Sequence, residues 1–116
     1  NPVKQYLDSL SKYADLPADV LVLPSHGKPF TGIHTRIQQL RDHHAERLQE
    51  VLDACTTPLS AHDIVPIMFK RPLDAHQLTF ALGEALAHCH HLWFEGKLQR
   101  RLDADEVYRF VRSATN

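Results

Sequence analysis

The sequence predicts a mainly helical α+β fold with a β-hairpin near its C-terminal end and a short strand in its N-terminal part. Three observations support this fold class. Apolar residues recur at three- and four-residue steps over long stretches, which indicates amphipathic helices. Two runs of β-prone residues flank the polar segment Asp103-Ala104-Asp105-Glu106, which indicates a hairpin. Four apolar residues, Val20 to Leu23, lie between Pro17 and Pro24 and predict a strand buried on both faces.

Composition and charge are those of an ordinary globular domain. Of 116 residues, 43% are hydrophobic and 23% are charged, and the net charge is −1. This charge gives no bulk attraction to nucleic acid or to anionic membranes. No apolar run approaches the roughly 20 residues that span a bilayer, and no signal-peptide pattern is present. Cys55 and Cys89 are too few for a disulfide framework, so we expect them to be small buried residues in a reducing cytoplasm.

The N-terminal segment reads as a helix followed by a strand. Asn1 and Pro2 are typical of a helix start, and one apolar stripe continues to about Tyr13. Pro24 ends the predicted strand because proline has no N–H to donate to a sheet. The chain then turns through Ser25-His26-Gly27, so we expect His26 to stand at the C-terminal end of a buried strand.

Three further helices are predicted, over residues 33–55, 61–69 and 75–94. Ser60 and Asp63 resemble a capping box, Asp74 is placed to cap the last helix, and Gly96 to end it. On the last helix we expect an inward face and a core that includes the aromatic residues of this region. These residues are Leu78, Ala81, Leu82, Ala85, Leu86, Cys89 and Trp93, with Phe69, Phe80 and Phe94.

The strands of the hairpin are predicted at residues 97–102 and 107–112. A helix, a short helix, a long helix and a hairpin follow one another in the order of a winged-helix domain. The long helix carries no Lys or Arg, which argues against reading of the DNA major groove. The hairpin is richer in positive charge, and Lys97, Arg100 and Arg101 are candidate phosphate contacts, although a solvated hairpin face is the simpler interpretation.

Taken alone, His26 has two interpretations. A histidine between a buried strand and a glycine can cap the strand or bind a metal. A zinc site needs three or four ligands, and no pair of Cys, His or Asp at zinc spacing lies near it in sequence.

The chain resembles the C-terminal part of metallo-β-lactamase superfamily hydrolases. The resemblance rests on Tyr6-Leu7-x-Ser9-Leu10, on Leu23-Pro24-Ser25-His26-Gly27, and on the following helix with Arg36-Ile37, His43, His44 and Arg47. The later helices and the hairpin resemble the small winged-helix domain appended to some of these enzymes. The family usually has Gly where this chain has Ser25, and its HxHxDH metal motif is absent from these residues.

This resemblance implies a division of the chain into three parts. Residues 1–32 would be the end of a metallo-β-lactamase αββα domain, 33–58 a connecting helix, and 59–116 a winged-helix-like domain. His26 would be one ligand of a site for two zinc ions, with the other ligands upstream. Those ions would activate a hydroxide that attacks an ester, thioester, lactam or phosphodiester. The present residues alone would be inactive.

The resemblance also implies partners and a role for the winged-helix-like domain, residues 59–116, which we call the tail. The expected partners are an upstream catalytic domain and a small-molecule substrate in the cytoplasm. Phe30 and Lys28 follow the His26 turn and are candidates to line the substrate cleft. The tail would cover the fold, shape the cleft or mediate dimer contacts. An alternative is a stand-alone winged-helix module that binds nucleic acid or docks on another protein.

The remaining histidines are interpreted as structural. His88 and His91 share a helix face at a spacing that can chelate a metal, but a polar or half-buried helix end is the simpler account. His43 and His44 point about 100° apart on a helix, which argues against a shared metal.

Overall fold

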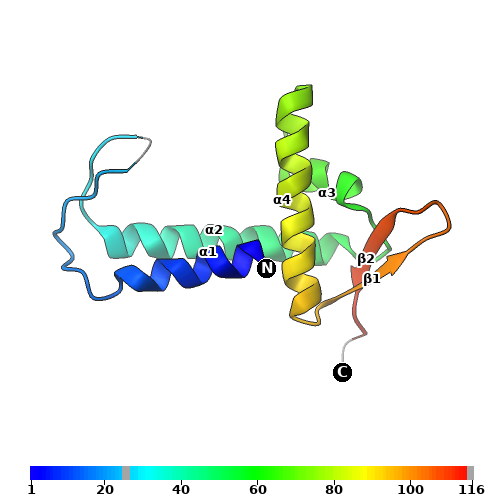
Figure 1. Ribbon diagram of the computed structural model, residues 1–116, viewed down its shortest axis with the longest axis horizontal. Coiled ribbons are helices and arrows are strands. Elements are labelled where there is room, and N and C mark those ends of the chain that lie inside the picture. The colour runs from blue at the N-terminus through cyan, green and yellow to red at the C-terminus, as the bar shows by residue number, and fades with distance from the viewer. Residues whose placement is uncertain (25–26, 115–116) are drawn as a thin grey trace.

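The computed structural model describes residues 1–24 and 27–114 of the chain. These residues form α-helices, one 3₁₀ turn and a two-stranded antiparallel sheet (Figure 1). In chain order the elements are α1 (Pro2–Leu10), η1 (Ser11–Tyr13), α2 (Ile33–Ala54), α3 (Ala61–Met68), α4 (Ala75–Phe94), β1 (Leu98–Leu102) and β2 (Tyr108–Arg112). The predicted mainly helical α+β fold is therefore confirmed.

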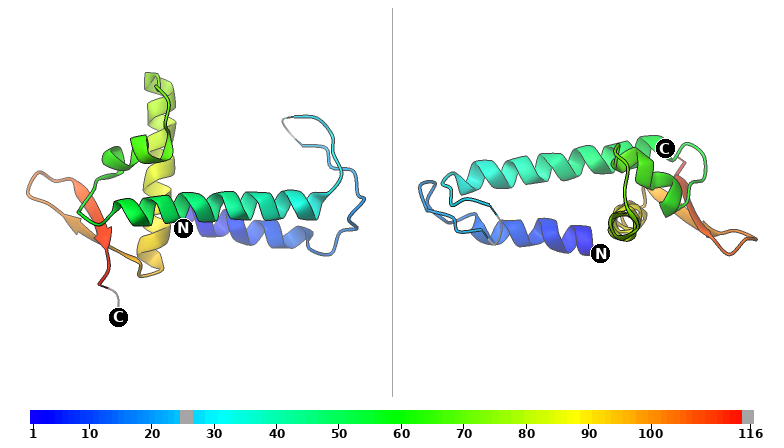
Figure 2. Two further views of the ribbon diagram at one scale, coloured as in Figure 1. Left: turned by 180° about the vertical axis from the view of Figure 1, so that it is seen from behind. Right: turned by 90° about the horizontal axis from the view of Figure 1, so that it is seen from above.

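The helices are arranged as a pair crossed by a third. The helices α1 and α2 lie side by side, and α4 crosses this pair steeply near the N-terminus of α1 (Figures 1 and 2). The helix α3 packs beside α4, and the hairpin lies beyond the C-terminal end of α2. The segments 14–24 and 27–32 lie at the opposite end of the α1–α2 pair (Figure 1). None of the helices in the described chain combines the length and apolar character needed to cross a bilayer.

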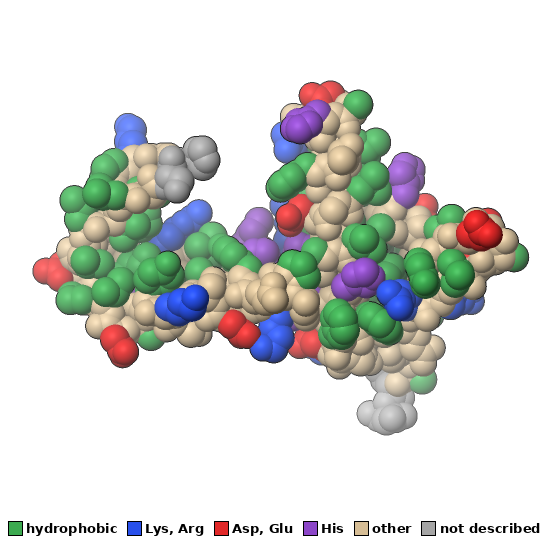
Figure 3. Space-filling view, viewed as in Figure 1, with side chains coloured by type: hydrophobic (Ala, Val, Ile, Leu, Met, Phe, Trp, Pro, Cys, Tyr) green, Lys and Arg blue, Asp and Glu red, His purple; other side chains and the backbone are tan. Residues whose placement is uncertain are grey.

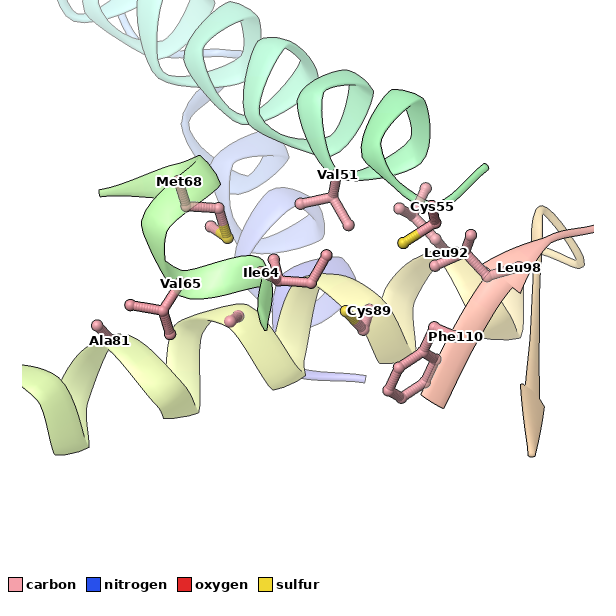
Figure 4. Packing of buried hydrophobic residues seen from close by; sticks show 11 residues of the cluster. Val51, Cys55, Ile64, Val65, Met68, Ala81, Cys89, Leu92, Leu98 and Phe110 are labelled. Carbon is pink, nitrogen blue, oxygen red and sulfur yellow. The ribbon is translucent and has the colours of Figure 1, made fainter. Parts of the chain in front are cut away.

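The hydrophobic core lies where α2, α3, α4 and the hairpin meet. Its fully buried side chains come from all four elements and face one another (Figure 4). The largest are Phe110, Ile64, Leu92, Leu98, Val51, Cys55 and Cys89. Both cysteines are free and fully buried, as the sequence predicts. Because this core joins residues from Val51 to Phe110, the C-terminal part of the chain has its own stabilising centre.

The predicted helix caps are present. Ser60 and Asp63 form a reciprocal capping box, in which the Asp63 N–H donates to Ser60 Oγ at 3.2 Å and the Ser60 N–H to Asp63 Oδ2 at 3.0 Å. Asp74 and Gln77 form a second box at the start of α4. Gly96 follows α4 with a φ of 76°, a left-handed conformation that glycine adopts without strain.

The hairpin is anchored to the helices by a third backbone segment. Its strands pair from Leu98 with Arg112 to Leu102 with Tyr108. Leu59, in the connection between α2 and α3, forms an antiparallel bridge with Phe110, with N···O distances of 2.9 and 2.8 Å. A helix, a single-residue bridge, two helices and a hairpin therefore follow one another along residues 33–112.

The predicted buried strand Val20 to Leu23 is wrong for the described residues. Only Val22 pairs, in an isolated bridge with Phe30, and Leu21 and Leu23 are 60% and 74% exposed. A strand is buried on both faces only when neighbouring strands and covering helices surround it. Apart from Phe30, the described chain supplies no backbone to pair with this segment. The segment is extended, but it belongs to no sheet here.

The prediction for α4 is wrong at three apolar positions. Phe80, Leu86 and Phe94 are predicted inside, but they are exposed to 66%, 40% and 63%. The N-terminal half of α4 projects past the α1–α2 pair and packs beside α3 (Figure 1). Farther along α4, where it meets the pair, the buried positions include His88 and His91, exposed to 2% and 7%.

Candidate functional site

The predicted metal ligand, His26, lies outside the described residues. The loop around it is closed at its base by the Val22–Phe30 bridge, whose N···O distances are 2.6 and 3.0 Å. Phe30 is half-buried and Lys28 is exposed. Their predicted role in a substrate cleft remains a prediction.

The described residues do not form a metal site by themselves. Within residues 1–24 and 27–114, no three His, Cys, Asp or Glu side chains lie close enough together to hold one ion. His88 and His91 instead bind protein groups through their Nδ1 atoms. A metal centre that uses this chain would therefore need ligands in addition to the described residues.

The predicted phosphate contacts of the hairpin have partners within the chain. The Arg100 guanidinium lies between the rings of Trp93 and Tyr108, at 3.9 and 4.6 Å from their centroids. Arg101 Nε lies 2.7 Å from Asp103 Oδ1, and Lys97 Nζ lies 3.6 Å from a carboxylate oxygen of Glu95. A phosphate would have to compete with these contacts, and the predicted role stays a prediction.

A cluster of imidazoles occupies the crossing of α1, α2 and α4. The rings of His44 on α2 and His88 on α4 are nearly parallel, 10° apart, with centroids separated by 5.6 Å. Tyr6 of α1 lies 5.0 Å from the His44 ring, and His43 lies 6.5 Å from it. We call His43, His44 and His88 the histidine cluster. Together with Tyr6, it joins three helices that are distant in sequence.

Two atoms of the histidine cluster are buried without a hydrogen-bond partner among the described residues. They are His44 Nδ1 and His88 Nε2. The other nitrogen of His88, Nδ1, lies 2.7 Å from the backbone oxygen of Glu84. A carbonyl can only accept, so in the neutral ring Nδ1 carries the proton and Nε2 presents a lone pair. A buried acceptor without a donor costs about 1–3 kcal/mol, which marks this position as unusual in a native fold.

Further histidines fasten the C-terminal end of α4. His91 Nδ1 lies 3.1 Å from Asn1 Nδ2, and its Nε2 lies 3.2 Å from Glu95 Oε1. Because Asn1 caps α1, this contact links the first helix to the last one. The ring of His90 lies 5.7 Å from that of Phe110, in the core.

The surroundings keep several of these imidazoles neutral. Burial lowers the pKa of His44 below its ordinary value, and His88 and His43 lower it further, against an opposing effect of Glu84. Burial also lowers the pKa of His90, with a contribution from the Arg100 guanidinium. For His91 burial lowers the pKa and outweighs the opposing Glu95 carboxylate.

These pKa shifts predict that acid destabilises the fold. Unfolded histidines titrate near pH 6.5, whereas His44, His90 and His91 take up protons only at lower pH in the fold. The unfolded state therefore binds more protons as the pH falls through 6.5, and stability decreases. We expect Tm to be lower at pH 5.5 than at pH 7.5, by about 4 °C for each 1 kcal/mol by which the free energy of unfolding decreases. Thermal unfolding followed by circular dichroism measures this.

Two variants test the source of this pH dependence. In His44→Gln the difference in Tm between the two pH values should shrink, whereas in the control His76→Gln it should remain, because His76 is exposed. The carboxylates whose pKa values are lowered, Asp63, Asp103 and Asp105, lose their stabilising effect only near pH 4 and below. An equal Tm at pH 5.5 and 7.5 would contradict the prediction.

The members of the histidine cluster stand out in the sequence, but the sequence does not bring them together. Their spacing along α2 and along α4 is visible there, whereas the crossing of the two helices is not. Glu84 and Arg47 also influence the pKa of His44, and the sequence alone does not predict this. A signal is present in the polar residues Glu84 and His88, which stand four apart in the otherwise apolar stretch 80–89.

Comparison with known proteins identifies the family. Residues 48–113 match the family model described as "Metallo-beta-lactamase-like, C-terminal domain". The structure resembles that of a β-lactamase domain protein from Burkholderia ambifaria, with a TM-score of 0.95, 57% identity and coverage of 97% of this chain and 34% of that one. It also resembles a metallo-β-lactamase family protein from Thermus thermophilus, with a TM-score of 0.81, 32% identity and coverage of 97% and 34%. No curated protein matches the chain.

Together these matches cover the N-terminal segment as well as the later helices and the hairpin. The family model covers the end of α2, α3, α4 and the hairpin, and the two solved structures also include the N-terminal segment. The chain spans about a third of the length of each of these two proteins. The chain therefore belongs to the metallo-β-lactamase-like family, and it corresponds to the C-terminal part of such a protein.

Proposed function

We propose that this chain is the C-terminal region of a zinc-dependent hydrolase of the metallo-β-lactamase fold. In this proposal residues 1–32 complete the catalytic domain, and His26 supplies one ligand of a site for two zinc ions. The observation that carries the proposal is the match to the C-terminal family model, together with the similarity to two longer proteins of the family over 97% of the chain. The exposed Leu21 and Leu23 are consistent with an additional sheet partner at this segment.

The described residues carry no reaction step in this proposal. They do not fit a metal ion alone, because no group of three ligands is formed among them. Their role would be to position the loop that carries His26 and to supply the tail. We also infer a cytoplasmic location, which the two free, buried cysteines favour over an oxidising compartment.

The tail is proposed to be a winged-helix-like domain that shapes the substrate cleft or mediates dimer contacts. The order of helix, bridge, two helices and hairpin supports this description. The alternative, a stand-alone module that binds nucleic acid, has less support. Arg100 lies between two aromatic rings and Arg101 pairs with Asp103, so the basic hairpin is engaged within the chain.

Metal removal from the longer protein tests the proposed function. A protein that contains this chain and an upstream catalytic domain is dialysed against a chelator and assayed on an ester, a thioester and a phosphodiester. We expect hydrolysis of at least one substrate class to fall by at least about 100-fold and to return with zinc, because the metal supplies the nucleophile. The 116-residue chain alone is expected to be inactive. Hydrolysis that survives complete metal removal would contradict the proposal.

A further inference from the structure

The inner face of the hairpin continues beyond the hydrophobic core. Directly paired and alternate residues of a hairpin lie on one side of it, and on the inner side they include Leu98, Arg100, Leu102, Tyr108 and Phe110. At the base of this face Leu98 and Phe110 are buried in the core. Leu102 and Tyr108, which pair next to the turn, are 56% and 48% exposed. The described helices therefore cover only the base of this face.

The exposed part of this face continues onto the end of α4 as a stack of side chains. The Arg100 guanidinium lies between the rings of Trp93 and Tyr108, and the ring of Phe94 lies 5.0 Å from that of Trp93. We call Trp93, Phe94, Arg100, Leu102 and Tyr108 the hairpin strip. Figure 3 shows hydrophobic side chains over the C-terminal end of α4 and along the hairpin. Trp, Tyr and Arg are enriched among the residues that dominate binding at protein interfaces.

The hairpin strip lies away from the part of the chain that would join a catalytic domain. The helix α4 stands between the N-terminus of α1 and the hairpin (Figures 1 and 2). In the proposed function, residues 1–32 complete the catalytic domain, which places that domain on the other side of α4. A second copy of the protein is therefore better placed to cover the strip than the catalytic domain of the same copy.

The charges of the hairpin indicate which partner fits this face. Most charged side chains of residues 95–112 form ion pairs, which are Arg101 and Arg109 with Asp103, Arg109 with Asp105, Lys97 with Glu95, and Arg112 with Asp53. Among the described residues, Arg100 and Glu106 form none. The face therefore offers one cation and one anion, which suits neither a polyanion such as nucleic acid nor a strongly charged protein.

One unpaired charge of each sign makes the hairpin complementary to itself. The polar contact of the Arg100 guanidinium among the described residues is long, 3.5 Å to His90 Nε2. Glu106 is exposed at the turn and has a φ of 65°, a left-handed conformation that favours glycine over glutamate. In a two-fold interface, residue i of one copy contacts residue j of the other, and j contacts i. Arg100 and Glu106 can therefore form two equivalent ion pairs across such an axis.

We propose that the hairpin strip is the interface through which two copies of the protein form a symmetric dimer, with Arg100 of each copy paired to the partner subunit's Glu106. This inference rests on the proposed function for the position of the catalytic domain and for a tail that mediates dimer contacts. Neither zinc nor His26 takes part in the contact. A stable interface buries about 800 Å² per partner, so the polar surface around the strip would form its rim.

Self-association of a longer protein that contains this chain and its upstream domain tests the proposal. Sedimentation velocity from about 0.1 to 100 μM should show a dimer, because that range covers weak and moderately tight association. Leu102→Asp places a charge within the apolar strip and should raise the dimer Kd at least about 50-fold. The control Gln99→Asp adds the same charge to the opposite face of β1 and should dimerise as the unaltered protein does.

Charge reversal tests the reciprocal ion pair and keeps the proposal testable if Leu102→Asp does not fold. Arg100→Glu and Glu106→Arg should each raise the dimer Kd at least about tenfold, because each brings like charges together at both equivalent contacts. The double variant restores opposite charges across the axis, and it should dimerise more tightly than either single variant. A contact of the strip with the catalytic domain of the same copy would not produce this rescue.

The proposal is overturned if the longer protein is monomeric over the whole concentration range, or if Leu102→Asp dimerises as tightly as the unaltered protein. It is also overturned if the double variant dimerises no more tightly than the single variants. Zinc-dependent hydrolysis is assayed separately on the same samples. A dimer without hydrolysis would refute the proposed hydrolase and support the interface, whereas an active monomer would refute the interface alone.

Discussion

In a longer protein that contains this chain and the proposed zinc site, His26→Ala is expected to lower zinc content and hydrolytic activity together. The Leu23-Pro24-Ser25-His26-Gly27 segment resembles the family motif whose histidine binds the second metal of a dinuclear site. Removing one ligand of a three- or four-ligand site leaves the ion weakly held, and activity should fall by roughly 100-fold or more. Zinc per protein, measured by atomic emission after gel filtration, should decrease from two ions towards one.

A matched histidine variant controls for a general effect of imidazole loss. His62 is exposed on α3, and His62→Ala should leave both zinc content and activity unchanged. Full zinc occupancy in the His26→Ala protein would show that His26 is not a ligand, even if activity fell.

The sequence allowed the helices and the hairpin to be predicted because their signals are local. Helix periodicity, the capping boxes at Ser60 and Asp74, and the left-handed Gly96 each depend on a few neighbouring residues. The strand at Val20 to Leu23 was predicted from composition alone, and composition does not supply the partner strands that a sheet needs. Both strands of the hairpin lie within this chain, whereas the described residues include no partner strand for the Val20 to Leu23 segment.

The histidine cluster was not predictable because it depends on how helices cross. Periodicity along α4 shows which residues share a face, but the covering element changes along its length. The N-terminal half of α4 projects past the α1–α2 pair (Figure 1), and near His88 the helix meets α2. On the same helix, the apolar Phe80 is therefore exposed, whereas the polar His88 is buried. Only the tertiary arrangement determines that His44 and His88 stack.

The largest expected loss of stability comes from Phe110→Ala. Phe110 is fully buried, and its ring packs in the core where β2 meets α4. Its backbone also forms the bridge to Leu59, which ties the hairpin to the α2–α3 connection. Truncating a buried phenylalanine costs about 3–5 kcal/mol through lost burial and the cavity left behind. A domain of this size has about 5–15 kcal/mol of stability in total, so the variant should be close to unfolding.

A second phenylalanine on the same chain provides the control. Phe94, at the end of α4, is 63% exposed, so Phe94→Ala should change the free energy of unfolding by less than about 0.5 kcal/mol. Urea unfolding of both variants at pH 7.5, above the range in which the imidazoles titrate, measures the difference directly. Comparable losses in the two variants would show that the core is not centred on Phe110. A selective loss in Phe110→Ala would show that the C-terminal part of the chain is stabilised by the contact between its hairpin and α4.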